Sequence, residues 1–255
     1  MRDVMAYVHR RVEEQHVHPF LEWLRDESVP ARDRLSRWLP HNAGFAMGFM
    51  DLNTLILRYP DEEAALCRLK RAINHHADQD GTHWEWYLRD LQKLGLNRKM
   101  RFTGGLKLLW NDETRAIRRF AYRVCGLANK YRDPVMRFCI LMPFEEFAQV
   151  LFAQLARVSR RYAAETSVEL EYVGEIHSKH EPGDLINQED EEETRRMFRD
   201  VKLNDADRAA AMDISRYLCD EIVTRWMSNL RVATENRIWS MLVLPPASSA
   251  ERAGT

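Results

Sequence analysis

Apolar residues recur at helical spacing along nearly the whole chain, and this periodicity restricts the fold more than any other feature. Near the start, Val4, Val8 and Val12 recur every fourth residue and therefore share one helix face. No convincing alternation of polar and apolar residues, as in a half-buried strand, accompanies this pattern. Amphipathic helices bury their apolar stripes against one another, so we expect an all-α protein built as a helical bundle.

Proline, glycine and capping residues give the expected helix boundaries. The helical regions that we predict are 2–27, 32–38, 43–58, 61–94, 107–129, 134–163, 167–180 and 205–242. Pro19 and Pro143 are expected to kink or split their regions, and Gly81 to break region 61–94. Because no repeat or linker divides the chain, we expect a single domain over 1–244 and a flexible C-terminal tail over 245–255.

Charge and cysteine content narrow the partners and the compartment. A net charge of −1 provides no overall field to attract nucleic acid or an anionic membrane. No apolar run reaches the roughly 18 residues of a membrane span, and the start of the chain lacks a signal-peptide core. The cysteines lack a C-x-x-C pair and are expected to be buried, reduced thiols: Cys67, Cys125, Cys139 and Cys219. These features predict a cytoplasmic protein with neither nucleic acid nor membrane as a partner.

The first stretch that suggests chemistry is 74–87. His76, Asp80 and His83 have the i, i+4, i+7 spacing of one helix face, and apolar neighbours indicate that this face is buried. Burying two imidazoles and a carboxylate is costly unless they are paired or bind a metal. A core histidine that hydrogen-bonds to an aspartate is the other interpretation, and the sequence does not decide between the two.

The second stretch lies in region 134–163. Glu145 falls within a mostly apolar stripe, and the adjacent Glu146 lies on a neighbouring face. A buried glutamate is rare unless it is paired, so at least one of these acids is expected to point into the core, with Glu145 preferred. A salt bridge to an arginine is the alternative role.

The third stretch combines His177, Glu181 and Asp184, which offer nitrogen and oxygen ligands at helical offsets. His180 is an alternative ligand to His177. A polar helix C-terminus, where histidine is favoured by the helix dipole, would also explain these residues. Three such stretches on three helices predict a metal site in the core of a bundle, and mixed nitrogen and oxygen ligands favour iron or manganese over zinc.

In these three stretches the sequence resembles the haem-oxygenase-like superfamily, and within it the haem-oxygenase-like di-iron oxidases and oxygenases. Asp80-x2-His83 matches the carboxylate and histidine of that family's first ligand helix, Glu145 its second, and His177-x3-Glu181 the start of its third. Two features depart from the pattern: Asp184 replaces the last histidine of the third motif, and the helix-breaking Pro182-Gly183 lies just before it. The longer form of the first motif is matched only if His76 replaces its acid.

The resemblance implies a single haem-oxygenase-like bundle, often a homodimer, with two iron ions or manganese in their place. It implies His83, Glu145, His177 and Glu181 as core ligands, with Asp80, His76 and Asp184 as further ligands. Tyr87, one turn from His83, is expected to donate a hydrogen bond to the ligand shell. The implied reaction is the activation of dioxygen to oxidise a small amino-acid-like or fatty-acid-like substrate.

Three other functions remain open from the sequence. A haem-binding relative would use His9, His16 or His18 as an axial ligand, but we do not favour haem. A thiaminase-like hydrolase would need a cysteine nucleophile, for which only Cys219 has acids beside it. A metal-free helical bundle that acts as a binding protein is the third.

Overall fold

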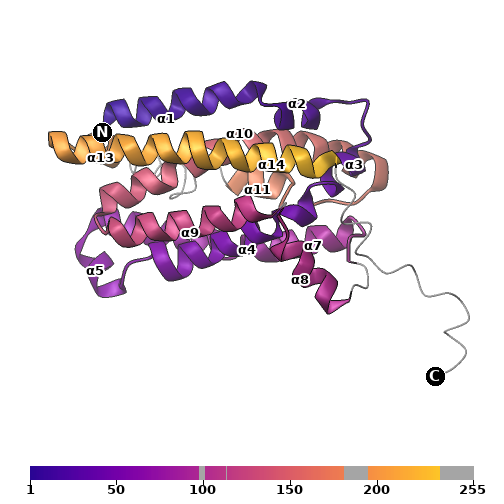
Figure 1. Ribbon diagram of the computed structural model, residues 1–255, viewed down its shortest axis with the longest axis horizontal. Helices are drawn as coiled ribbons and strands as arrows, with labels where there is room; N and C mark the ends of the chain where they lie inside the picture. The colour runs from indigo at the N-terminus through magenta and orange to yellow at the C-terminus, as the bar shows by residue number, and fades with distance from the viewer. Residues whose placement is uncertain (98–100, 113, 181–194, 236–255) are drawn as a thin grey trace, which may run out of the picture.

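The computed structural model describes residues 1–97, 101–112, 114–180 and 195–235, and these ranges contain helices and no strand. The all-α prediction is therefore confirmed, and the helices pack as a bundle (Figure 1). The expected tail at 245–255 and the end of predicted region 205–242 lie outside the described residues.

The α-helices with defined bounds are α1 (Arg2–Glu14), α2 (Pro19–Arg25), α3 (Ala31–Ser36), α4 (Ala43–Asp51), α5 (Asp61–Leu66), α6 (Arg68–Asp80), α7 (His83–Lys93), α8 (Phe102–Trp110), α9 (Arg115–Lys130), α10 (Pro134–Thr166), α11 (Glu175–His180), α13 (Asp205–Arg216) and α14 (Thr224–Glu235). Two short 3₁₀ segments are η1 (Gln15–Val17) and η2 (Leu39–Asn42). Two π-helical segments are η3 (Leu52–Leu57), which continues α4, and η4 (Tyr217–Val223), which joins α13 to α14.

Helix α10 is the central element of the bundle. It contacts α1, α2, α3, α6, α9, α11, α13 and η4. The side chain of Asp133 caps its start by accepting the amides of Val135 and Met136. By length and composition α10 could cross a membrane, but 78% of its most apolar window is buried among the other helices. Its apolar character is therefore what the core of a bundle requires.

Pro143 was expected to kink or split its helix, and the split is wrong, since α10 runs through that position as one helix of 33 residues. An interior proline costs about 3 kcal/mol in an exposed helix. Here Phe138, Leu141, Phe144 and Phe147 around it are all buried, and their burial offsets that cost.

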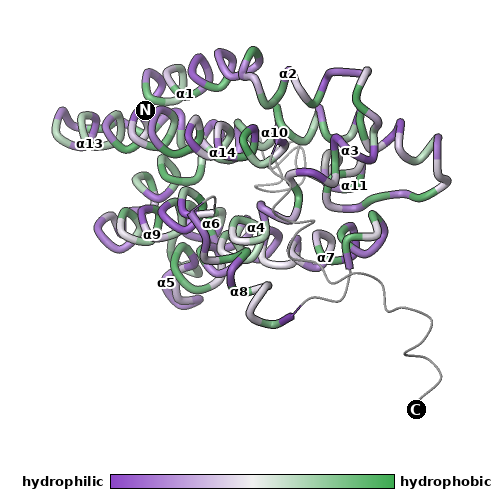
Figure 2. Tube along the Cα trace, turned by 45° about the vertical axis from the view of Figure 1, so that its right-hand side comes forward, coloured by the Kyte–Doolittle hydropathy of each residue, from purple (hydrophilic) through white to green (hydrophobic). Residues whose placement is uncertain are grey.

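The outer helices form layers on both sides of α10. In Figure 1, α1 runs beside the α13–η4–α14 rod, and both α1 and α13 contact α10. Charged pairs join these two elements at their exposed edges, including Arg208 to Asp3 at 2.6 Å and Arg11 to Asp220 at 2.8 Å. Hydrophilic and hydrophobic residues alternate with helical period along the outer helices (Figure 2), as the sequence pattern predicts.

Region 167–180 differs from its predicted helix. Ser167 adopts a left-handed conformation (φ 60°) that ends α10, and helix resumes only at Glu175. The reason is the buried carboxylate of Asp90, which accepts the backbone amides of Glu171 and Val173. Those amides are thereby held in a turn, and Leu170 and Val173 do not share a helix with His177.

Candidate metal centre

A helix break brings Asp80 and His83 to facing helix ends. Gly81 and Thr82 separate α6 from α7, so the predicted break is present. A Cβ atom on Gly81 would lie 2.9 Å from Cγ2 of Thr54 in η3, which explains the glycine at this close approach. Asp80 Oδ1 and His83 Nδ1 are 3.5 Å apart across the break.

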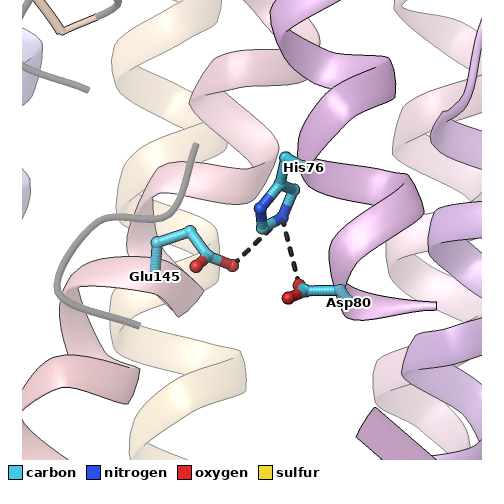
Figure 3. Close-up of side chains that lie close together, drawn as sticks. All are labelled: His76, Asp80 and Glu145. Carbon is cyan, nitrogen blue, oxygen red and sulfur yellow. Dashed lines mark ion pairs between the residues drawn. The ribbon is translucent and has the colours of Figure 1, made fainter. Parts of the chain in front are cut away.

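The tightest cluster joins α6 to α10. His76 Nε2 lies 3.2 Å from Asp80 Oδ2 and 3.3 Å from Glu145 Oε1 (Figure 3). His76 is 2% exposed. Burial, helped by the neighbouring Glu145 carboxylate, raises the pKa of the Asp80 carboxyl despite the nearby imidazoles. Two acids that converge on one imidazole repel each other when both are ionised, and a bound cation would relieve this repulsion.

The geometry of this cluster fits a metal ion. One ligand atom from each of His76, Asp80 and Glu145 can be chosen so that all three lie within 4.8 Å of one another. Metal–ligand bonds of about 2.1 Å place ligand atoms up to about 4.2 Å apart around one ion, so the three atoms would have to move slightly closer together to bind the same ion. One imidazole and two carboxylates form a donor set that suits iron or manganese.

Two further imidazoles border the cluster. The rings of His83 and His177 are 4.5 Å apart between centroids, and His83 also stacks on Trp86 at 4.6 Å. Nδ1 of His177 lies 2.6 Å from the carbonyl oxygen of Tyr172, so we assign the ring proton to Nδ1 and the lone pair to Nε2. This second partner is typical of a metal-ligating histidine, because it fixes the tautomer and the ring orientation.

Burial lowers the pKa of His177 to about 4. The imidazole is therefore neutral at pH 7, which is the form that binds metals. Because the folded pKa lies below the unfolded value of 6.5, this group stabilises the fold above pH 6.5 and loses that contribution as the pH falls towards 4.

A pH-dependent stability follows for the metal-free protein. Between pH 7 and pH 5 the wild type should lose roughly 2 kcal/mol more unfolding free energy than His177→Gln, which cannot titrate. Urea unfolding of EDTA-treated proteins at the two pH values measures this difference. An equal loss in both proteins would show that His177 is solvated or already protonated.

Asp90 on α7 holds the segment that positions His177. It is fully buried, and it accepts Glu171 N–H at 2.7 Å and Val173 N–H at 3.0 Å, one on each carboxylate oxygen. These bonds fix the turn that carries Tyr172, whose carbonyl in turn orients His177. Arg89 and Lys93 support the same turn through Glu171, each at 2.8 Å.

Asp90→Asn should therefore weaken both the fold and the metal site. The amide nitrogen would face one backbone N–H, which leaves that donor unsatisfied and costs about 2 kcal/mol. Because the turn that orients His177 would loosen, iron binding at the proposed centre should weaken about tenfold. Denaturant unfolding and metal titration measure the two effects, and the exposed Asp213→Asn is the matched control, expected to change stability by less than about 0.5 kcal/mol. Equal behaviour of the two variants would remove Asp90 from this role.

The sequence patterns predicted no role for Asn53 in η3 or for Asp90. The Asn53 side chain is fully buried, and its Nδ2 donates to Asp80 Oδ2 at 3.3 Å. This bond and the contact between Thr54 and Gly81 place η3 against the end of α6. The position of Asn53 in a mostly apolar run could have indicated a buried polar role. No feature of the sequence around Asp90 indicated its role.

A narrow cavity of about 40 Å³ opens beside the cluster. Asp80, His83, Glu145 and His177 line one side of it. The rest of its lining is aromatic or small, and consists of Phe45, Ala46, Phe49, Phe144, Ala148, Phe152, Tyr172 and Trp226. Since one water needs about 10–15 Å³ of such volume, the cavity has room for a few molecules of the size of water or dioxygen. A larger ligand requires the aromatic side chains to move.

The structure thus brings together five of the predicted ligands: His76, Asp80, His83, Glu145 and His177. The predicted ligands Glu181 and Asp184 lie outside the described residues.

Two neighbouring side chains point away from the cluster. Tyr87 is buried, and its hydroxyl donates to the carbonyl of Leu39 at 2.7 Å, not to the ligand shell as we expected. Glu146 faces His9 at 3.3 Å and Arg195 at 3.5 Å.

The residues of the rival functions lie elsewhere. Cys219 is buried, and burial raises the pKa of its thiol to about 12, which opposes the thiolate that a nucleophile requires. The potential axial haem ligands are engaged at the surface of the N-terminal helices. His16 pairs with Glu13 at 3.6 Å, and His18 caps α2 by accepting Phe20 N–H.

No protein-family model matches the chain, and no match to a curated protein was found.

Proposed function

We propose that the protein is a non-haem oxidase or oxygenase that uses two iron ions, or manganese in their place, to activate dioxygen. The observation that carries this proposal is the convergence of His76, Asp80 and Glu145 from two core helices, with His83 and His177 beside them. Carboxylates and histidines projecting from facing helices are how bundles hold a dinuclear centre.

The residues of the chain have distinct parts in this proposal. Asp80 and Glu145 would neutralise the cations, and His76 would complete the first position with a neutral nitrogen. His83 and His177 are proposed for the second position, together with Glu181 and Asp184. Bound iron would supply the redox chemistry that amino-acid side chains lack. The aromatic walls would exclude bulk water from the reacting atoms.

The cavity favours a substrate that presents an apolar group to the metal. Among the described residues that line it there is no lysine or arginine, so none of these side chains would neutralise a buried carboxylate. Of the two expected substrate classes, a fatty-acid-like chain or an amino acid with an aromatic side chain would place its apolar part in the cavity once the aromatic walls move apart. Its polar end would stay outside or bind the metal itself.

Oxygen consumption by the ferrous protein tests the proposal. Protein reconstituted anaerobically with ferrous iron should consume dioxygen in a single turnover as the iron is oxidised, and straight-chain fatty acids should accelerate this uptake. His76→Ala should reduce oxygen uptake to the rate of free ferrous iron. His75→Ala is the control and should keep the faster uptake, because His75 is the exposed neighbour on the same helix. If wild type and both variants all matched free ferrous iron, the cluster would be a buried polar network in a metal-free binding protein.

A further inference from the structure

Helix α9 carries five cationic side chains and no acid among its 16 residues. One of the five, Arg118, is used structurally, because it donates to the carbonyls of Leu109 and Asn111 at the end of α8. Arg115, Arg119 and Arg123 are exposed and recur every fourth residue along one face. Like charges at this spacing destabilise a helix, so the arrangement needs a reason other than helix stability.

These arginines line a groove of about 340 Å³ between α9 and the η4–α14 segment. The opposite wall presents Tyr217, Ile222 and Arg225, and the groove shares no lining residue with the cavity at the candidate metal centre. Its volume lies within the usual range of small-molecule sites. The wall includes the π-helical turn of η4, and π-helical turns frequently occur at functional sites.

The charges in the groove are only partly balanced. Asp112 pairs with Arg115, and Glu221 pairs with Arg225 at 2.6 Å. Among the residues that the structure describes, Arg119 and Arg123 form no ion pair with an acid. The four arginines and two acids of the lining leave two positive charges, both on the α9 face.

We propose that this groove binds the phosphate group of a small molecule. Two adjacent guanidinium groups offer two planar sets of donors, which match the three acceptor oxygens and the near-double charge of a phosphate monoester. A single carboxylate would neutralise only one of them. The Tyr217 ring and the aliphatic side chains of Ile222 and Ala116 would contact the less polar remainder of the ligand.

Calorimetric titration with inorganic pyrophosphate at low ionic strength tests this assignment. Wild type should bind at one saturable site, and Arg119→Ala/Arg123→Ala should weaken binding at least tenfold. The matched control is Arg157→Ala/Lys202→Ala, which removes two exposed cations from other surfaces and should change affinity less than threefold. Circular dichroism melting curves verify that both double variants fold.

Two results would overturn the proposal. One is the absence of saturable binding by wild type, and the other is equal weakening in the two double variants, which would reduce α9 to a solvated cationic face. Sedimentation with phosphatidic-acid vesicles distinguishes the sources of such a phosphate. A soluble ligand predicts that wild type stays in the supernatant, whereas a lipid headgroup predicts co-sedimentation that depends on Arg119 and Arg123.

Discussion

At the proposed metal centre, Glu145→Gln should abolish iron binding, whereas Glu146→Gln should retain it. The two glutamates are adjacent in α10, but only Glu145 faces His76, at 3.3 Å. The amide is the same size as the carboxylate but carries no charge to offset the cation. Mutating a residue that only hydrogen-bonds to a metal ligand typically lowers metal affinity about 10–100-fold. Loss of a ligand itself should therefore weaken binding about 100-fold or more. Anaerobic titration with ferrous iron or manganese measures the affinities.

The stability of the metal-free variants provides a second readout. Glu145→Gln removes one of two converging acids, so its melting temperature without metal should equal or exceed that of wild type. A structural salt bridge predicts the opposite, because loss of Glu145 would then destabilise the fold. Equal iron affinity in both glutamine variants would exclude Glu145 as a ligand.

Gly174→Ala should destabilise the protein strongly, because it disrupts the turn that positions His177. A Cβ atom at Gly174 would lie 1.9 Å from the carbonyl oxygen of Leu170, a contact with backbone that no rotamer change can relieve. The turn over 170–174 must then move, which breaks the bonds that Asp90 makes to it. We expect a loss of about 3 kcal/mol, and a fall in melting temperature of roughly 6–10 °C.

Gly126→Ala is the control for that experiment. Gly126 lies on α9, and a Cβ atom there meets nothing within 4 Å. Because alanine is favoured over glycine in a helix by about 1 kcal/mol, this variant should be at least as stable as wild type. Thermal unfolding and iron content are measured on both. A Gly174→Ala protein with wild-type stability and iron would show that the turn does not position His177.

The helical class could be predicted from the sequence because the periodic apolar stripe is local information. The same is true of the break at Gly81, where a glycine follows an acidic helix end. The i, i+4, i+7 reasoning placed His76, Asp80 and His83 near one another, although they lie across two helices and not along one.

The remaining features depend on contacts between distant segments. Asp90 folds residues 170–174 into a turn from 81 residues away, and this long-range bond overrides the helical pattern of that stretch. The π-helical form of η3 places Asn53 against Asp80. A π-helical turn contains one more residue than an α-helical turn, and this single residue does not visibly change the apolar periodicity of the sequence. The choice between Glu145 and Glu146 also required the neighbouring helices, because Glu146 is the more buried of the two acids and yet Glu145 is the one that faces His76.

Iron content per chain is the sharpest test of the proposed metal centre. Protein reconstituted anaerobically with ferrous iron and freed of excess metal is analysed for wild type and His177→Ala. We expect close to two irons per chain in wild type, and loss of at least one in the variant. No bound iron in either protein would contradict the metal centre, and the converging histidines and carboxylates would then be a buried polar network of a binding protein.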